Sequence, residues 1–332
     1  MSYVVRRETL EELQPEWEAL LSQMADPHVF FHPSFQRAWL DVFGDGGEPL
    51  VLGVREGRRL VGVAPLLRDG RRLTLLGDHE VFDYMDFVVA PGQEMPFFAY
   101  VLRFLADEEW DELDLRGLAR SSPTLAHLPA VAADLGLRMS TELEAVAPRV
   151  DLPDSWEAYL ESLDKKDRHE LRRKMRRLSA AGGEVRLRDL RRPEEVSAAL
   201  DDFFRLHAAS RRDKADFMTE PMEVFFRRMA AALSEKGMVR LFLMELDSRL
   251  AAVVLCFDCC DQLHLYNSGF DPELSDLSVG VISKALCLQA AIAEGKARLD
   301  FMRGAEPYKY HLGARDLEIF RCRVRRTQDE GP

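Results

Sequence analysis

Apolar positions along the chain alternate between helical spacing and short β-type runs. Leu10, Leu13, Trp17, Leu20 and Leu21 recur every three or four residues, as expected for an amphipathic helix. Continued through the first half, the pattern predicts two helices, four strands, and then helices alternating with strands. The expected ranges are 10–24, 33–43, 50–54, 60–67, 72–76, 85–89, 95–105, 112–115, 123–135 and 143–150.

The second half repeats this order of elements. Helices are followed by three consecutive strands with tight turns, then by a helix and further strands. The expected ranges are 156–163, 165–181, 185–190, 193–210, 221–236, 239–246, 250–257, 262–268, 279–294, 298–301, 306–311 and 317–325.

Two local sequence matches accompany the shared order. Arg59–Ala64 resembles Arg249–Val254, and Leu113–Gly117 resembles Leu299–Gly304 with one residue inserted. Chance likeness between strand compositions is the competing explanation. The order and the matches together favour duplication of an α/β module with a mixed sheet. We expect one module over residues 1–152 and a second over 153–332.

Composition narrows the class of protein. The 332 residues are 47% hydrophobic and 31% charged, which is typical of globular domains rather than disordered chains. Apolar runs such as Ala251–Phe257 are far shorter than the ~20 residues that cross a bilayer, so membrane insertion is not expected. The N-terminal sequence lacks the pattern of a secretory signal, which predicts a cytoplasmic location. A net charge of −12 argues against DNA binding.

The five cysteines do not form a recognisable metal site. Cys256 and Cys259 make a C-x-x-C pair where a strand enters a turn, and no second pair follows. A structural zinc ion needs about four ligands. We therefore expect incidental thiols, and no metal.

One predicted helix has a net charge opposite in sign to that of the whole chain. Residues 164–178 contain eight Lys or Arg and three acidic residues, a net charge of +5. Lys165, Arg168 and Arg172 share one face beside an apolar stripe. The face is either a solvated surface or a site for an anion, such as a nucleotide-sugar diphosphate, a polyphosphorylated carrier or the tRNA backbone.

Two further segments carry candidate chemistry. A strand leads through a loop to a helix start at Ser278–Val281, where backbone N–H groups can bind phosphate and Ser278 is a natural N-cap. Ionisable residues then crowd the end of the next strand, where ligands of α/β sheets bind. In the first half, Asp83 and Asp86 flank Tyr84 and could deprotonate or orient an amine. The crowded segment includes Arg303, Glu306, Tyr308 and Lys309.

Residues 165–168 (KKDR), 265–271 (LYNSGFD) and 303–313 (RGAEPYKYHLG) resemble the GNAT superfamily. The resemblance is specifically to cellulose-biosynthesis-type (CelD-like) acetyltransferases related to Fem-type aminoacyltransferases. It implies tandem GNAT-like modules and acyl transfer from a thioester, usually acetyl-CoA or another acyl-CoA, to an amine.

The resemblance also implies roles for individual residues. Asn267, Ser268 and Gly269 would accept the pantetheine amides, and Ser278, Val279, Gly280 and Val281 would take the pyrophosphate. Lys309 would stabilise the transition state with Tyr308 as acid, while Asp83 would act on the acceptor amine. The remaining substrate contacts would be Lys165, Arg168, Arg172, Tyr84, Asp86, Arg303 and Glu306.

Three functions follow from these expectations. The first is an N-acyltransferase that uses acyl-CoA and a small-molecule or nucleotide-sugar acceptor. The second is a Fem-like transferase that uses aminoacyl-tRNA and a cell-wall precursor, which Asp276 favours because an aspartate repels pyrophosphate. The third is a non-catalytic GNAT-like protein in polysaccharide assembly. Of these, an enzyme is the favoured prediction, and the sequence gives no indication of oligomeric state.

Overall fold

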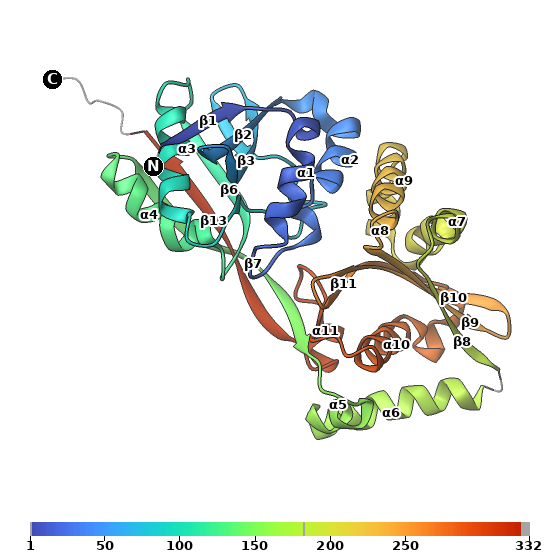
Figure 1. The fold of residues 1–332 in the computed structure, drawn as a ribbon. Helices are drawn as coiled ribbons and strands as arrows, with labels where there is room; N and C mark the ends of the chain where they lie inside the picture. Colours follow the sequence, from blue (N-terminus) through green and yellow to red (C-terminus); the bar gives the residue numbers. More distant parts are fainter. Residues whose placement is uncertain (1, 182, 327–332) are drawn as a thin grey trace. The chain divides into compact units, whose positions relative to one another are not determined.

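The computed structural model describes residues 2–181 and 183–326, which fold into two compact units. The first unit comprises the chain up to Val146 together with the chain from Leu317 onward, and the second comprises Ala147–Asp316. Both are α/β, as the hydrophobic pattern predicts (Figure 1). The last strand joins the first unit, whereas the sequence pattern places it in the second module.

The first unit orders its strands β1-β2-β3-β4-β6-β13-β7, with β5 paired to β3. β4 and β6 run parallel, and the pairs β1–β2, β2–β3, β3–β4 and β6–β13 are antiparallel. Its elements are β1 (Tyr3–Arg7), α1 (Leu10–Leu21), α2 (Pro33–Phe43), β2 (Glu48–Glu56), β3 (Arg59–Asp69), β4 (Arg72–Leu75), β5 (Val88–Val89), α3 (Glu94–Ala106), β6 (Glu112–Ala119), α4 (Pro123–Asp134), β7 (Arg138–Asp151, which continues into the second unit) and β13 (Arg315–Arg325).

The second unit orders its strands β7-β12-β11-β10-β9-β8. Here β11 and β12 are the parallel pair, which matches the place of β4 and β6 in the first unit. The other elements are α5 (Trp156–Ser162), α6 (Lys165–Ala180), β8 (Val185–Leu190), α7 (Pro193–Ser210), α8 (Arg212–Phe217), α9 (Glu220–Ser234), β9 (Val239–Leu246), β10 (Arg249–Cys259), β11 (Gln262–Phe270), α10 (Val279–Ala293), β12 (Arg298–Asp300) and α11 (Pro307–His311).

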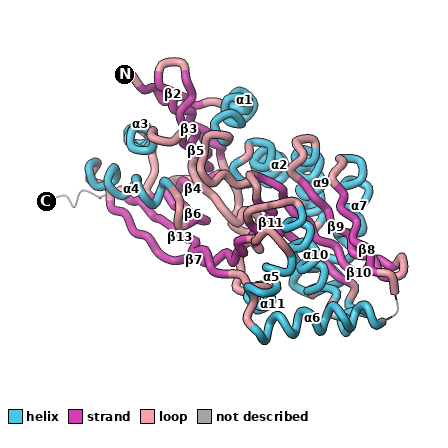
Figure 2. The backbone as a smooth tube through the Cα atoms, turned by 60° about the horizontal axis from the view of Figure 1, so that its bottom comes forward, coloured by secondary structure: helices cyan, strands magenta, loops and turns pink. Residues whose placement is uncertain are grey.

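Helices cover both faces of the second unit's sheet. α7 and α9 lie on one face, and α5, α6 and α10 lie on the other (Figures 1 and 2). The core of the second face joins Tyr159 of α5, Leu171 of α6 and Leu288 of α10 to strand residues such as Val254. The apolar stripe predicted for the basic helix is confirmed, because Leu171 and Leu178 are both buried.

Some elements are not apparent from the sequence pattern. β1 and α8 are short, with five and six residues, so each offers too few apolar positions for a recognisable pattern. The strand expected over 85–89 is reduced to Val88–Val89. Instead of pairing within a strand, the N–H of Met85 donates to the carbonyl of Gly117 at 2.9 Å.

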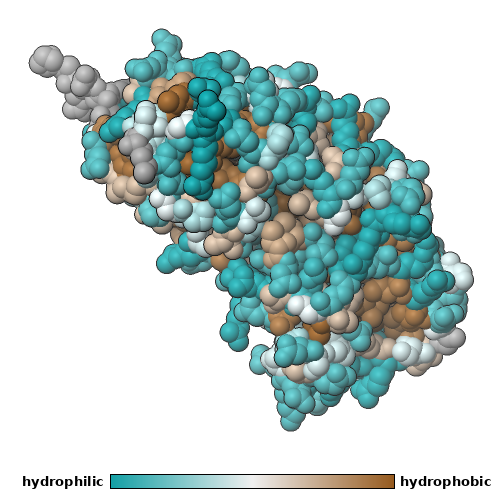
Figure 3. All heavy atoms as spheres, viewed as in Figure 1, coloured by the Kyte–Doolittle hydropathy of each residue, from teal (hydrophilic) through white to brown (hydrophobic). Residues whose placement is uncertain are grey.

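No helix among residues 2–181 and 183–326 is long and apolar enough to cross a membrane. The face of the chain seen in Figure 3 is mostly hydrophilic, with apolar side chains gathered in small patches.

Gly269 of β11 packs closely against the backbone of α7. A Cβ atom there would lie 2.3 Å from the backbone nitrogen of His207 in α7. We expect Gly269→Ala to lower the free energy of unfolding by about 2–3 kcal/mol, because backbone must shift to admit the methyl group. Gly46→Ala is the control, since a Cβ there meets nothing within 4 Å, and it should change stability by less than about 0.5 kcal/mol. Urea denaturation followed by circular dichroism measures both, and equal stabilities would refute the packing role.

Candidate active site

The second unit's sheet opens along one edge of β11. β12 pairs with β11 at Gln262, Leu263 and His264 and then ends at Asp300, while β11 continues to Phe270. Among the described strands, only β10 continues to pair with this last part of β11. Backbone groups beyond the carboxyl end of β12 are therefore placed to meet a ligand.

Three predicted pantetheine contacts lie on this part of β11. The side-chain oxygen of Asn267 is 3.1 Å from Nε2 of His207, and the carbonyl of Ser268 accepts a hydrogen bond from Nζ of Lys214. Burial is the main reason that the pKa of His207 falls to about 4, so its ring is neutral near pH 7. Because Gly269 has no side chain, the backbone of α7 can pack directly against β11. The structure thus gives each of the three a contact within the protein.

Two lysines lie near this edge, the buried Lys284 and the half-buried Lys214. Lys284 is the one charged residue of α10, and its Nζ donates to the carbonyl of Gly280 at 2.7 Å. Burial, followed by the charge of Lys214, lowers the pKa of Lys284 to about 7. Burial and the neighbouring Arg211 lower the pKa of Lys214 to about 8. Near neutral pH a substantial fraction of the Lys284 amine is therefore uncharged, whereas most of Lys214 stays charged.

Sequence reasoning missed both lysines. A signal existed for Lys284, because a single lysine in an otherwise apolar helix needs a reason to be buried. Lys214 gave no comparable signal, since α8 is short and contains other charged residues.

The predicted catalytic residue Lys309 is almost wholly buried, with 1% of its surface exposed. Its Nζ lies 2.9, 3.0 and 2.8 Å from the carbonyl oxygens of Met302, Arg303 and Gly304. It also lies 2.9 Å from a carboxylate oxygen of Glu306. The three N–H donors are therefore committed to the loop that precedes α11, a geometry that favours a positioning role.

That loop has unusual backbone angles. Met302 and Gly304 have φ values of 61° and 113°, in the left-handed region that side chains disfavour. The ammonium of Lys309 gathers the carbonyl groups of this turn. Arg303 contributes its carbonyl group to the same contact, and its side chain is half-buried.

Tyr308 lies between the loop and α10. Its ring centroid is 5.0 Å from Nζ of Lys284, and the ring meets Phe301 edge to face at 84°. Burial raises the pKa of the Tyr308 hydroxyl, which stays protonated. Burial also acts to raise the pKa of Glu306, but hydrogen bonding to Lys309 and its charge outweigh this and leave the pKa lowered. The predicted pair Tyr308 and Glu306 therefore joins Lys284 in one cluster.

The start of α10 differs from the predicted phosphate loop. Ser278 has a left-handed φ of 58°, and its side chain makes no capping hydrogen bond. Its carbonyl instead accepts from the N–H groups of Val281 and Ile282, both at 3.0 Å. Ser278 is the N-cap residue of α10, as predicted, but with this left-handed backbone its side chain does not supply the capping hydrogen bond that was expected of it. Val279 is fully buried.

Gly280 has a packing role in addition to any contact with phosphate. A Cβ atom at Gly280 would lie 2.9 Å from the ring of Phe270. A larger residue at this position would require the Phe270 ring to shift, so glycine allows the helix start to lie close to the end of β11.

A hollow of about 540 Å³ lies between α6, the start of α10 and α11. Its basic residues are Lys166, Arg173 and Lys174, not the predicted face of Lys165, Arg168 and Arg172. The apolar stripe of α6 packs into the core of the second unit, and the face that carries Lys166, Arg173 and Lys174 borders the hollow as a result. The complete lining is Lys166, Asp167, His169, Glu170, Leu171, Arg173, Lys174, Val281, His311 and Leu312.

The predicted α6 residues have other surroundings. Arg168 donates to the carbonyl of Glu161 at 3.2 Å, and Lys165 and Arg172 are exposed. Within the hollow, Arg173 binds Glu170 through two hydrogen bonds of 2.7 and 2.8 Å. These bonds are the main reason that the pKa of Glu170 falls to about 2.

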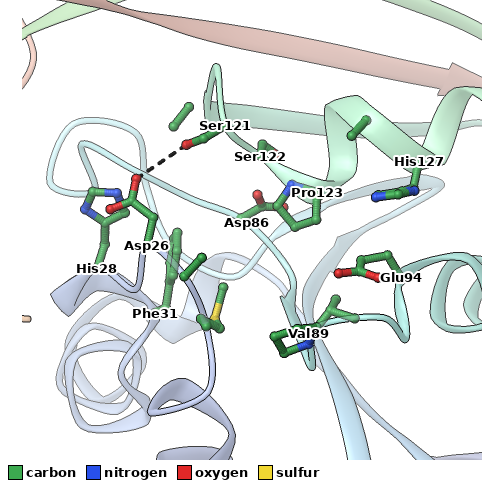
Figure 4. Close-up of a pocket in the computed structure, with 15 residues that line it drawn as sticks. Asp26, His28, Phe31, Asp86, Val89, Glu94, Ser121, Ser122, Pro123 and His127 are labelled. Atoms are coloured by element: carbon green, nitrogen blue, oxygen red, sulfur yellow. Dashed lines mark hydrogen bonds between the residues drawn. The ribbon is translucent and has the colours of Figure 1, made fainter.

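The first unit contains a separate pocket of about 270 Å³, shown in Figure 4. Asp86 reaches this pocket from the chain segment before β5. Tyr84 does not, because it is fully buried and stacked on His28 with ring centroids 4.0 Å apart. Asp83 is half-buried and lies outside the residues that line the pocket. Of the three predicted residues, only Asp86 is thus placed to meet a ligand in it.

The Asp86 carboxylate accepts hydrogen bonds from the Phe87 N–H at 2.8 Å and from the Thr124 hydroxyl. Burial raises its pKa to about 6, although hydrogen bonds from Ser122, Thr124 and Phe87 act to lower it. No group of metal-ligating side chains occurs in the part of the chain that the structure describes.

Comparisons with known proteins identify the second unit's fold. Residues 165–310 match the family model of the acetyltransferase (GNAT) domain. A search of curated proteins gave no match.

Solved structures resemble the whole chain. FemX is 12% identical, with 97% of each chain covered and a TM-score of 0.65. A tandem GNAT protein from the clavulanic acid biosynthesis pathway is 14% identical, covering 99% of this chain and 100% of its own, with a TM-score of 0.52. L-PGS from Bacillus licheniformis is 10% identical, covering 90% and 93%, with a TM-score of 0.55. At these identities the likeness concerns the fold, and it agrees with tandem GNAT-like modules.

The role of Lys309 can be tested by Lys309→Met. We expect the free energy of unfolding to fall by about 3 kcal/mol or more, because three carbonyl groups lose a buried donor. Lys165→Met is the matched control on an exposed lysine, with an expected change below about 0.5 kcal/mol. Chemical denaturation measures both. An undiminished stability combined with lost activity would instead favour a direct catalytic role.

The raised pKa of Asp86 predicts a pH-dependent stability. The value is about 6 in the folded chain and 3.8 for an unperturbed aspartate, so folding is favoured when the group is protonated. Relative to Asp86→Asn, the wild type should therefore lose roughly 3 kcal/mol of stability as pH rises from about 4 to above 6. Urea denaturation across this range measures the difference. Parallel curves for the two proteins would contradict the assignment.

Proposed function

From the premise that residues 165–310 belong to the GNAT superfamily of acyltransferases, we propose that the chain is an N-acyltransferase. It takes an acyl group, most simply acetyl, from acyl-CoA and passes it to an amine of a small or sugar-nucleotide acceptor. The observation that carries this proposal is the cluster of Lys284, Tyr308 and Glu306, with Lys214 close by at the open edge of β11. This cluster brings groups that can accept a proton close to a group that can donate one.

The reaction needs one proton removed and one supplied. The acceptor nitrogen attacks the thioester carbonyl carbon, so that a C–N bond forms and the C–S bond breaks. Lys284 in its uncharged form takes the proton from the acceptor nitrogen, which its lowered pKa permits near pH 7. Tyr308, kept protonated by burial, gives its proton to the departing thiolate. The positive charge of Lys214 stabilises the oxyanion.

The donor would follow the open edge of β11. Backbone groups of Asn267, Ser268 and Gly269 would receive the pantetheine amides, with Lys214 moving from the Ser268 carbonyl to admit them. The pyrophosphate would lie at Ser278–Val281, and the basic residues of the α6 hollow beside Val281 offset the charge of Asp276. Lys309 and the carbonyl of Arg303 position the loop that carries Glu306 and Tyr308.

A second candidate function uses aminoacyl-tRNA as the donor and a cell-wall precursor as the acceptor. The observation that favours it is α6, whose eight basic residues include the exposed Lys165 and Arg172. Such a surface suits a nucleic-acid backbone. Activity with charged tRNA and none with acyl-CoA would select this function.

Acyl transfer can be measured with acetyl-CoA and a panel of primary amines, with released coenzyme A quantified by chromatography. Lys284→Met should lower kcat by about 10²-fold to 10⁴-fold, because the proton acceptor is lost. It should also remove the rise in kcat with pH near 7 that we expect for the wild type. Persistence of that rise in the variant would refute the role of Lys284.

The proton donor has a matched control. Tyr308→Phe should lower kcat by about 100-fold. Tyr310→Phe, two residues away, removes a hydroxyl that donates to Asp316 at 2.7 Å. This exposed hydrogen bond lies outside the proposed reaction, and surface substitutions change stability little, so kcat should stay within about twofold. Equal effects of the two substitutions would exclude Tyr308 as the acid.

A further inference from the structure

The pocket of the first unit has an acidic lining. Figure 4 shows the carboxylates of Asp26, Asp86 and Glu94 around it, together with His28 and His127. No Lys or Arg is among the described residues that line it. A concave site that holds three carboxylates and no permanent cation favours a positively charged ligand.

Asp86 differs from the carboxylates of an ordinary surface cluster because it is buried. It is 5% exposed and lies beside the start of α4, where Thr124 and the N–H of Phe87 fix its orientation. A buried carboxylate is poorly solvated, so a cation that reaches it replaces missing hydration. The elevated pKa of Asp86 agrees with such an environment.

Apolar side chains and packed rings form the rest of the pocket wall beside the carboxylates. His28 is stacked on the buried Tyr84, and Phe31 meets the His28 ring edge to face with centroids 5.4 Å apart. These contacts hold the two rings in place, and aliphatic groups complete the wall. The apolar lining includes Met24, Phe31, Val89, Pro91, Pro123 and Ala126.

The size of the pocket limits its ligand. About 270 Å³ is below the 300–1,000 Å³ usual for drug-sized ligands. A whole sugar nucleotide does not fit, whereas an aliphatic stem ending in an ammonium group does. The hydroxyl of Ser121, which donates to Asp26 at 3.4 Å, lies among the acids and offers a further polar contact.

We propose that this pocket binds the ammonium-bearing end of an aliphatic primary amine, with the charge at Asp86 and Glu94 and the stem along Phe31 and Val89. Calling this amine the acyl acceptor rests on the proposed function. The binding itself depends only on the first unit's own residues.

Isothermal titration of the full chain with 1,4-diaminobutane at pH 7.5 and low salt tests the site. We expect one molecule to bind per chain. Asp86→Asn and Glu94→Gln should each weaken binding at least tenfold. Glu109→Gln changes an exposed carboxylate of the same unit that does not line the pocket, and it should bind as the wild type does. 1,4-Butanediol, which has the same length without charge, should not bind.

Equal affinity in Asp86→Asn, Glu94→Gln and the wild type would overturn the inference, as would binding of the diol as tight as that of the diamine. Glu94→Gln guards against misfolding of the Asp86 variant, because Glu94 is only half-buried.

Acyl transfer separates the two proposals. Lys284→Met should still bind the diamine while losing its acetylation. If no donor supports acylation of any amine yet the pocket binds diamine, the proposed function fails and the site stands. If other amines are acylated but diamine does not bind, the site fails and the proposed function stands.

Discussion

The second unit's candidate chemistry depends on one buried ammonium group. Lys309 draws together the carbonyl groups of Met302, Arg303 and Gly304 and so fixes a turn with two left-handed residues. That turn determines where Glu306 and Tyr308 stand. Because the three donors of the ammonium are committed to these carbonyl groups, the geometry favours a positioning role for the lysine. The function proposed above therefore assigns the proton transfers to the neighbouring Lys284 and Tyr308, whose Nζ atom and ring centroid lie 5.0 Å apart.

Each unit holds one local group of titratable side chains, and the two groups differ in the sign of their charge. In the second unit, the buried Lys284 and the half-buried Lys214 lie near the end of β11, and desolvation lowers the pKa of both. In the first unit, carboxylates gather in a pocket, and burial raises the pKa of Asp86. In both places, burial moves a titratable group towards neutrality near physiological pH. Such groups can accept or release protons at little free-energy difference.

Local patterns predicted much of the fold and part of the candidate site. The order of elements follows from apolar spacing, and Tyr308 and Lys309 stand out in a dense polar segment. Lys284 was missed because helical periodicity records only that α10 is apolar, not that its lysine faces Tyr308. The lining of the α6 hollow was misjudged for a related reason. A helix's own pattern locates its apolar stripe, but the neighbour that its polar flank meets is set by the chain far away.

The pairing of β13 with β6 also has a consequence for synthesis of the protein. β6 ends at Ala119, whereas β13 begins at Arg315, so the first unit's sheet joins segments separated by the whole second unit. When the ribosome has synthesised only the first half of the chain, β13, which this sheet requires, does not yet exist. The second unit, Ala147–Asp316, is continuous and can close earlier. The nascent chain consequently completes its N-terminal unit last, against the usual order of domain folding.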